Sequence, residues 1–354
     1  MTFFNSKVGI FCFSEDSNFF ENFFSTANIK LINDPAHSEL ACLHFPYPYK
    51  KSFEQFVENN LSNFDRVLIV ITELHEFTFN FCKKYDHHKI TYVIAGTLNH
   101  PLEHSKVYTF MDWFNTTADV YHLFPEYLTE LVPESNRLAF DALLGRRKPN
   151  RDFAFSFINE RLPNCGIVRY ATGQKFIDFT DTLQWESPVT GLDVGNITFT
   201  VETVEYKKHH IRLSHLVPVN IYNKTNFSVV AETNTSNNFV FLTEKTAKCL
   251  VAQRLFVILG NRYSLRFLHE LGFKTFDCII DEDYDNQSNP EDRFGMAMEQ
   301  VEWLCKKDWR DIEQSLQPIV KHNHDLIMNT DWRFTPVLAD AMQNWLGSCL
   351  WPRT

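Results

Sequence analysis

Short runs that are apolar at every position restrict the fold of this chain more than any other feature. The run at 67–71 reads VLIVI, and a strand that lacks a polar face has to be covered on both sides. Over the first 150 residues such runs alternate with helical patterns. Alternating strands and helices form right-handed βαβ units and an open parallel sheet. The sequence therefore predicts an α/β fold.

The alternation returns in the second half of the chain. In the first half we expect strands at 7–13, 39–45, 66–72, 90–95 and 106–110, helices at 18–26, 53–61 and 75–85, and helical structure over 115–144. In the second half we expect strands at 152–158, 227–232, 255–259 and 275–279, and helices at 243–252, 264–271, 291–306, 309–329 and 336–346. The β-rich segment 174–215 is predicted as extra strands or a long excursion.

The charged segment 145–150, GRRKPN, carries both Gly and Pro and lies near the middle of the chain. We interpret it as an interdomain link. A length of 354 residues suits about two domains. The prediction is an N-terminal domain at 1–150, a second domain at 151–330, and a C-terminal helix within 331–354 that packs back on the first. Both domains are expected to be Rossmann-like and doubly wound, facing across a cleft, with ligands at the carboxyl ends of the strands.

Composition excludes several classes of protein. A net charge of −10 argues against broad affinity for nucleic acid. The eight cysteines contain no Cys-x-x-Cys pair, which disfavours zinc ribbons and thioredoxin-type sites. Scattered thiols in a long chain indicate a reducing compartment, so we expect a cytoplasmic protein. No apolar stretch approaches the roughly 20 residues of a membrane span, and no motif predicts a metal site.

The most informative stretch is 227–276, in which an apolar strand ends in Glu232 and a polar loop leads to Thr243, Glu244 and Lys245 at the start of a helix. Thr243 is placed to act as N-cap, and Glu244 complements the positive end of the helix. A helix N-terminus at the carboxyl end of a parallel strand is an anion site. Lys245 could bind a phosphate there, and a carboxylate could accept both hydroxyls of a ribose. The alternative is a surface helix with a solvated lysine.

The order of these pieces resembles the donor-binding motif of the fucosyltransferase-type glycosyltransferases. Ala231-Glu232-Thr233, Phe241 to Lys245 and Arg254 to Gly260 occupy its three segments. The segment GFKTFDCIIDEDYD, at 272–285, also resembles viral and phage members of this group. Thr233 and Phe256 depart from the family's Asn and Pro, so the resemblance does not imply that the sugar is fucose.

The resemblance implies a two-lobed, GT-B-type transferase without an obligatory metal or cofactor, in which a nucleotide-sugar is the co-substrate. The second domain would hold the donor and the first the acceptor. Glu244 would bind the ribose, Lys245 the diphosphate, and Glu232 would lie near the sugar. Members of the family also have an Arg after the first strand of the second domain. In this chain Arg161 is the first candidate for that residue and Arg169 the second. Gly260 would let the backbone approach the ligand.

An inverting transfer needs a carboxylate that removes the proton of the acceptor hydroxyl. Glu73 follows the run VLIVIT and is the first candidate, and Asp112 follows the strand expected at 106–110. The carboxylates at 15–16 follow the first strand and are a further option. For Glu73 the simpler alternative is that it caps the next helix.

The sequence thus predicts a glycosyltransferase that is inverting and metal-independent. Its acceptor is open: a glycan, a lipid, a protein, or a hydroxymethylated base in viral DNA, which residues such as Arg146, Arg147, Lys148 and Arg151 could help to bind. The rival hypothesis is a non-catalytic bilobal protein that binds a nucleotide or sugar. No oligomeric state is predicted.

Overall fold

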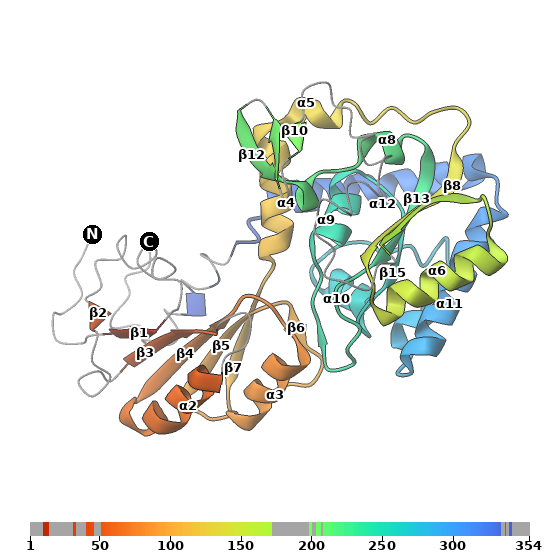
Figure 1. Cartoon of the computed structure of the whole chain (residues 1–354). Coiled ribbons are helices and arrows are strands. Elements are labelled where there is room, and N and C mark those ends of the chain that lie inside the picture. The colour runs from red at the N-terminus through yellow and green to blue at the C-terminus, as the bar shows by residue number, and fades with distance from the viewer. Residues whose placement is uncertain are drawn as a thin grey trace. The chain divides into compact units, whose positions relative to one another are not determined.

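The computed structural model describes residues 10–13, 31–32, 40–45, 51–171, 198–199, 203–206 and 208–333, with Val337, Asp340 and Ala341. The chain divides into two compact units. Unit 1 comprises Met1–Asp112 and Asp331–Thr354, and unit 2 comprises Trp113–Thr330 (Figure 1).

Unit 1 is built on a parallel sheet of six strands in the order β2-β1-β3-β4-β5-β7. These are β1 (Ile10–Phe13), β2 (Leu31–Ile32), β3 (Leu40–His44), β4 (Arg66–Ile71), β5 (Ile90–Ala95) and β7 (Lys106–Phe110). All six residues of β5 are buried, as are the last five of β4. The runs without a polar face thus form central strands, as the sequence analysis predicts.

Two helices of unit 1, α2 (Lys51–Asn60) and α3 (Glu76–Lys84), cover one face of this sheet through an aromatic cluster (Figure 1). Phe45, which follows β3, lies edge-on to Phe53 of α2 at 5.0 Å between ring centroids and to Phe81 of α3 at 4.9 Å. A buried Phe contributes roughly 1.5–3 kcal/mol. The cluster therefore fixes both helices to the end of β3.

Unit 2 is built on a parallel sheet of four strands in the order β15-β13-β8-β9. These are β8 (Leu138–Arg146), β9 (Gly166–Ala171), β13 (Thr225–Ala231) and β15 (Phe256–Leu259). Helices α6 (Pro149–Arg161) and α11 (Pro290–Cys305) contact each other, and α9 (Glu244–Val251) contacts α12 (Trp309–Asn329). The two pairs cover opposite faces of the sheet (Figure 1).

The remaining elements are short or lie beside the sheets. They are η2 (Leu61–Asn63), β6 (Thr97–Leu98), α4 (Asp112–Leu123), α5 (Pro125–Leu128), β10 (Thr198–Phe199), β11 (Thr203–Tyr206), β12 (His209–Arg212), η4 (Leu213–His215), α8 (Val219–Tyr222), β14 (Phe239–Val240), α10 (Ser264–Glu270) and η5 (Asp283–Asn286). Strands β10, β11 and β12 form a small antiparallel sheet. Extra strands expected within 174–215 are thus present, and 172–197 lies outside the described residues.

Both parallel sheets are wound in the same way. If the strands of each unit are counted along the chain, unit 2 has the order 2-1-3-4, and unit 1 begins with that order before its further strands. The winding reverses between the first and third strands, and ligands of doubly wound sheets bind at the carboxyl ends there. In unit 2 this point lies between β8 and β13. The predicted α/β fold with two parallel sheets is confirmed.

Most predicted elements agree with the structure, and three are wrong. Residues 138–144 belong to β8 instead of a helix. Residues 152–158 belong to helix α6, because Pro149 begins a helix well and Phe153 packs against Phe294 of α11. Residues 275–279 are not a strand. The expected helix 18–26 and most of 336–346 lie outside the described residues.

The domain limits also differ from the predicted ones. The division lies between Asp112 and Trp113 instead of at residue 150. The segment 145–150 connects β8 to α6 within unit 2, because a turn between a strand and a helix needs the same Gly and Pro signals as a link. Asp331–Thr354 are grouped with unit 1, where the Met111 N–H donates to the Trp332 carbonyl at 3.1 Å.

Candidate functional site

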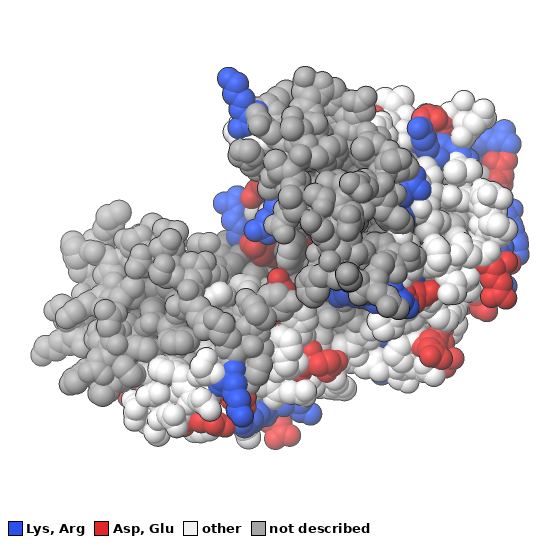
Figure 2. Space-filling view, in the orientation of Figure 1, with Lys and Arg blue, Asp and Glu red and all other residues white. Residues whose placement is uncertain are grey.

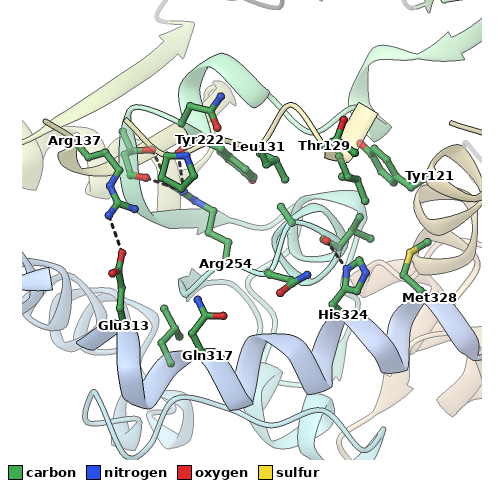
Figure 3. Close-up of a pocket in the computed structure, with 18 of the residues that line it drawn as sticks. Tyr121, Thr129, Leu131, Arg137, Tyr222, Arg254, Glu313, Gln317, His324 and Met328 are labelled. Atoms are coloured by element: carbon green, nitrogen blue, oxygen red, sulfur yellow. Dashed lines mark hydrogen bonds and ion pairs between the residues drawn. The ribbon is translucent and has the colours of Figure 1, made fainter. Parts of the chain in front are cut away.

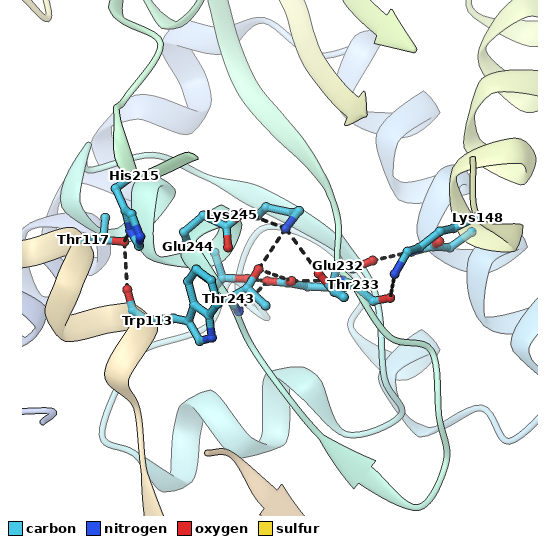
Figure 4. A network of polar contacts seen from close by, with 11 residues as sticks. Trp113, Thr117, Lys148, His215, Glu232, Thr233, Thr243, Glu244 and Lys245 are labelled. Carbon is cyan, nitrogen blue, oxygen red and sulfur yellow. Dashed lines mark hydrogen bonds and ion pairs between the residues drawn. The ribbon is translucent and has the colours of Figure 1, made fainter. Parts of the chain in front are cut away.

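Five of the seven predicted donor residues gather at the carboxyl edge of the unit 2 sheet, at the point where its winding reverses: Glu232, Thr243, Glu244, Lys245 and Gly260. Lys148 precedes α6 and its Nζ donates to the Thr233 carbonyl at 2.6 Å (Figure 4). Nδ2 of the buried Asn150 donates to the carbonyls of Glu232, at 3.0 Å, and Leu259, at 2.7 Å. One amide therefore ties the start of α6 to the ends of β13 and β15.

Glu232 lies fully buried at the end of β13, and its carboxylate holds the start of α9. It accepts hydrogen bonds from the Thr243 N–H at 3.1 Å, from Thr243 Oγ1 at 2.6 Å and from Thr246 Oγ1 at 2.7 Å. The Thr233 N–H adds a fourth at 3.2 Å. With four protein donors, Glu232 positions the helix, whereas the family resemblance implies a place near the sugar.

Thr243 occupies the N-cap position of α9 with an extended backbone, as predicted. Its side chain does not cap the helix, because the hydroxyl donates to Glu232. Glu232 therefore caps the start of α9, which is the role predicted for Thr243. It accepts hydrogen bonds from donors that the start of a helix leaves without partners.

Glu244 and Lys245 form an ion pair in the first turn of α9. Lys245 Nζ lies 2.7 Å from Glu244 Oε1, 3.1 Å from Thr243 Oγ1 and 3.4 Å from Thr233 Oγ1. Burial would raise the pKa of Glu244, but the charges of Lys245 and Lys248 and the Lys245 hydrogen bond lower it to about 2. An ionised carboxylate and an ammonium thus lie together at the positive end of a helix.

Gly260 follows β15 and lies against Glu232. A Cβ at this position would be 3.1 Å from Glu232 Cβ and 3.1 Å from Ile258 Cγ2. The glycine is needed for this close packing, and its carbonyl accepts a hydrogen bond from Arg293 Nε at 3.3 Å. Arg293 also donates to the Thr235 carbonyl at 2.9 Å, so it ties the loop after Glu232 to the end of β15.

The two arginines proposed to bind the donor do not join this group. Arg161 ends α6, roughly 16 Å along the helix axis from Asn150. Its Nη2 lies 2.5 Å from Glu302 Oε2 of α11. Arg169 lies in β9, two strands away from β13, and its Nη1 donates to the Val168 carbonyl at 2.8 Å. The cation that reaches the end of β13 beside Lys245 is Lys148.

The two candidate bases belong to, or border, unit 1. Glu73 follows β4, and its half-buried carboxylate lies 3.3 Å from His75 Nε2. The helix-capping alternative for Glu73 does not hold, since the N-cap position of α3 is His75. Asp112 is exposed and is the first residue of α4.

A buried histidine near Glu244 was not singled out by the sequence analysis. The His215 ring stacks on Trp113 of α4, with 5.5 Å between ring centroids and 20° between planes (Figure 4). Burial lowers the pKa of His215 to about 4, although the Glu244 charge raises it. Burial also lowers the pKa of Lys248, one turn along α9. No sequence pattern marks these residues, because η4 and α4 are far from α9 along the chain.

A pocket of about 570 Å³ lies in unit 2 at the opposite, amino-terminal edge of the sheet (Figure 3). Its lining includes Thr225, Arg254 and the ion pair of Arg137 and Glu313, whose Nη2 and Oε1 are 2.7 Å apart. Every nitrogen of the Arg254 guanidinium has partners within the protein. None of the predicted site residues lines this pocket.

Two further observations concern the described residues as a whole. They contain no group of three His, Cys, Asp or Glu side chains arranged to hold a metal ion. Among the described helices, none is both long and apolar enough to cross a bilayer.

Among solved structures, the chain is similar to one whose title reads "Crystal Structure of alpha1,3-Fucosyltransferase", with a TM-score of 0.42 and 11% sequence identity over 96% of this chain and 90% of that chain. The match says nothing of a viral source. No protein-family model matches the chain, and no curated protein matches it. Its function is therefore inferred from its own residues.

Proposed function

We propose that this chain is a glycosyltransferase that moves a sugar from a nucleotide-diphosphate donor to an acceptor hydroxyl. The observation that carries the proposal is the Glu244–Lys245 pair at the start of α9. It lies at the edge of a doubly wound sheet where ligands bind, and the segment around it resembles a known donor-binding motif.

In this proposal the diphosphate lies at the N-terminus of α9. Lys245 Nζ and the positive end of the helix would neutralise its charge. Lys148, held at the Thr233 carbonyl, would supply a second ammonium. Glu244 is ionised, so it can accept both ribose hydroxyls. A leaving group neutralised by side chains and a helix dipole needs no metal ion, so we propose a metal-independent reaction.

We propose inversion at the anomeric carbon. The acceptor oxygen would form the new glycosidic bond as its proton passes to a carboxylate, and the bond to the nucleoside diphosphate would break. Glu73 is the proposed base and Asp112 the alternative. Glu73→Gln should lower kcat at least about 100-fold with the donor KM unchanged, and Asp112→Asn should leave kcat unchanged. The reverse result would exchange the two roles.

The test begins with thermal shifts of the purified chain in nucleoside diphosphates and their sugars. A ligand that binds the folded state raises its Tm. We expect one base to give a selective shift, slow release of free nucleotide from the matching nucleotide-sugar, and the same rate in EDTA. Lys245→Ala should remove both the shift and the release, while Lys84→Ala, at the surface of unit 1, should keep both. No shift with any nucleotide would refute the proposal.

One observation favours the rival function, a non-catalytic nucleotide-binding or sugar-binding protein. The oxygens of Glu232 have protein donors, and Glu244 is paired with Lys245. Glu232 and Glu244 therefore serve to position α9 or to bind a ligand, instead of acting as a catalytic base. A binding protein would show the thermal shift and release no nucleotide from any donor.

The acceptor is proposed to be uncharged, such as a glycan. Acidic and basic side chains of the described residues are interspersed on the face in Figure 2, which offers no broad basic surface to a polyanion. A hydroxymethylated base in DNA is the alternative acceptor, and transfer of radiolabelled sugar to each substrate would decide. Free buried thiols such as Cys42 and Cys82 suit a reducing compartment, so we propose a cytoplasmic enzyme.

A further inference from the structure

The buried His215 in η4 has its hydrogen-bonding state fixed by two neighbours in α4. His215 Nδ1 lies 2.8 Å from Thr117 Oγ1, and Thr117 Oγ1 donates to the Trp113 carbonyl at 2.8 Å. A hydroxyl has one hydrogen, so Thr117 Oγ1 can only accept from His215. The proton of the neutral imidazole is therefore on Nδ1, and Nε2 carries a lone pair.

No described residue supplies a hydrogen-bond partner for this lone pair. His215 is only 2% exposed, and no hydrogen-bond donor among the described residues reaches its Nε2. A buried acceptor without a donor costs free energy, and native proteins rarely leave one unless a ligand or water completes it. The group that binds Nε2 must present an N–H or O–H, which excludes a fully ionised phosphate.

Lys248 offers the complementary group. It lies on α9 one turn after Glu244, with its side chain largely enclosed, and no hydrogen bond or ion pair joins its ammonium to the other described residues. The charges of Glu244 and Lys248 both act on the His215 ring. An acceptor and a donor that no other described residue pairs with therefore both lie near Glu244.

The contacts also show in which order the cations, Glu244 and His215 follow one another in space. Lys148 and Lys245 both reach Thr233, Lys245 is bonded to Glu244, and Glu244 acts on His215. Figure 4 shows the same succession, from Lys148 through Lys245 and Glu244 to Trp113 and His215. A nucleoside diphosphate has phosphates, ribose and base in one line. If Lys245 binds phosphate and Glu244 ribose, the base falls at His215.

We propose that His215 and Lys248 recognise the nucleobase of the donor and select a base with a lactam edge, as in guanine or uracil. His215 Nε2 accepts the ring N–H, and Lys248 donates to the adjacent carbonyl oxygen. At the same edge, adenine and cytosine have a ring nitrogen without a hydrogen in place of the N–H and an amino group in place of the carbonyl oxygen. Neither the contact with Nε2 nor the contact with the Lys248 ammonium can form with them. The inference rests on the proposed nucleotide-sugar donor and adds the choice of base.

The test uses a matched pair of variants of the full chain. In His215→Asn the side-chain amide can still donate to Thr117, but no acceptor remains at the position of Nε2. In His215→Gln the amide oxygen reaches that position. We expect the wild type to bind GDP or UDP about ten-fold or more tightly than ADP and CDP by calorimetry. His215→Asn should remove this preference, His215→Gln should retain part of it, and Lys248→Met should weaken it with an unchanged Tm.

A second measurement uses the wild-type chain, so it does not require that a variant folds. With 15N-labelled histidine, the Nε2 signal of His215 should be that of an unprotonated nitrogen and should move when the preferred diphosphate saturates the protein. A protonated Nε2, an unmoved signal, or a base preference unchanged in His215→Asn would overturn the inference, with the proposed function intact. If no nucleoside diphosphate binds the wild type, both fail.

Discussion

The two parallel sheets share a winding and differ in the residues that come directly after their strands. In unit 2 the strands on either side of the reversal lead into Lys148 and Asn150, after β8, and into Glu232, after β13. In unit 1, β3 leads into Phe45, which joins an aromatic cluster. At the strand ends that are described, the same topology thus leads into polar groups in unit 2 and into a helix-packing contact after β3 in unit 1. Winding defines where a ligand can bind, and the residues after the strands decide whether one does.

The sharpest test of this comparison is Lys245→Ala. We expect about a 1,000-fold loss of affinity for the preferred nucleoside diphosphate, since an enclosed ammonium that binds phosphate makes strong charge-assisted bonds. Lys84 of unit 1 also lies beside carboxylates, with Nζ 2.6 Å from Glu54 Oε1, but at an exposed site. Calorimetry of Lys84→Ala should show an unchanged Kd. Equal losses in both variants would contradict the assignment of the donor to unit 2.

The next largest effect concerns the buried carboxylate that holds α9. Glu232→Ala leaves the Thr243 N–H and two hydroxyls without an acceptor and opens a cavity. We expect the free energy of unfolding to fall by about 4 kcal/mol, together with loss of nucleotide binding. Glu73→Ala, at the end of a strand in unit 1, should cost about 1 kcal/mol or less. Urea unfolding of both variants would measure the difference.

His215 should make the stability of unit 2 depend on pH. Its pKa is about 4 in the folded chain and near 6.5 when exposed. Between these values the unfolded chain binds more protons, so the free energy of unfolding falls as the pH is lowered, by about 3 kcal/mol from pH 6.5 to 4.

His215→Asn lacks this titration, so its urea unfolding should vary less with pH. Glu282 and Asp285, whose pKa values burial raises to about 7 and about 6, titrate in both proteins and cancel in the difference. Parallel pH profiles would show that His215 is not buried in the neutral form.

The smallest expected effect tests how closely the unit 2 edge is packed. Gly260→Ala places a methyl group 3.1 Å from Glu232 Cβ, and we expect a cost of about 2 kcal/mol. Because the strain falls on Glu232, nucleotide affinity should fall as well. A variant with normal Tm and normal Kd would show that the edge has room to adjust.

Strands with no polar face could be predicted because their pattern is local. Strand β8 could not, since its sequence LAFDALLG also suits a helix. Its Asp141 is explained by distant partners, among them the buried Arg254, 2.6 Å away and 113 residues later. Helix α6 has an alternating sequence at 152–158, FAFSF within it, that imitates a strand.

The candidate site also has features that could be predicted from the sequence and features that could not. The start of α9 follows from adjacent residues, and the helix begins where the sequence predicts it. The ion pair of Glu244 and Lys245 was not predicted. The role of Glu232 depends on hydroxyls 11 and 14 residues away. The stacking of His215 on Trp113 depends on packing of distant segments. No local sequence pattern indicates contacts between residues so far apart in the chain.

The Asn150 amide has a mechanical consequence. Its Nδ2 bridges the last carbonyls of two neighbouring strands, and its backbone belongs to the first turn of α6. Shearing one strand past the other would break this bridge inside the protein, where water cannot replace it. This edge of the sheet is therefore stiff. Under the proposed function, the adjustments needed for entry and exit of the donor would fall to the side chains and loops around it.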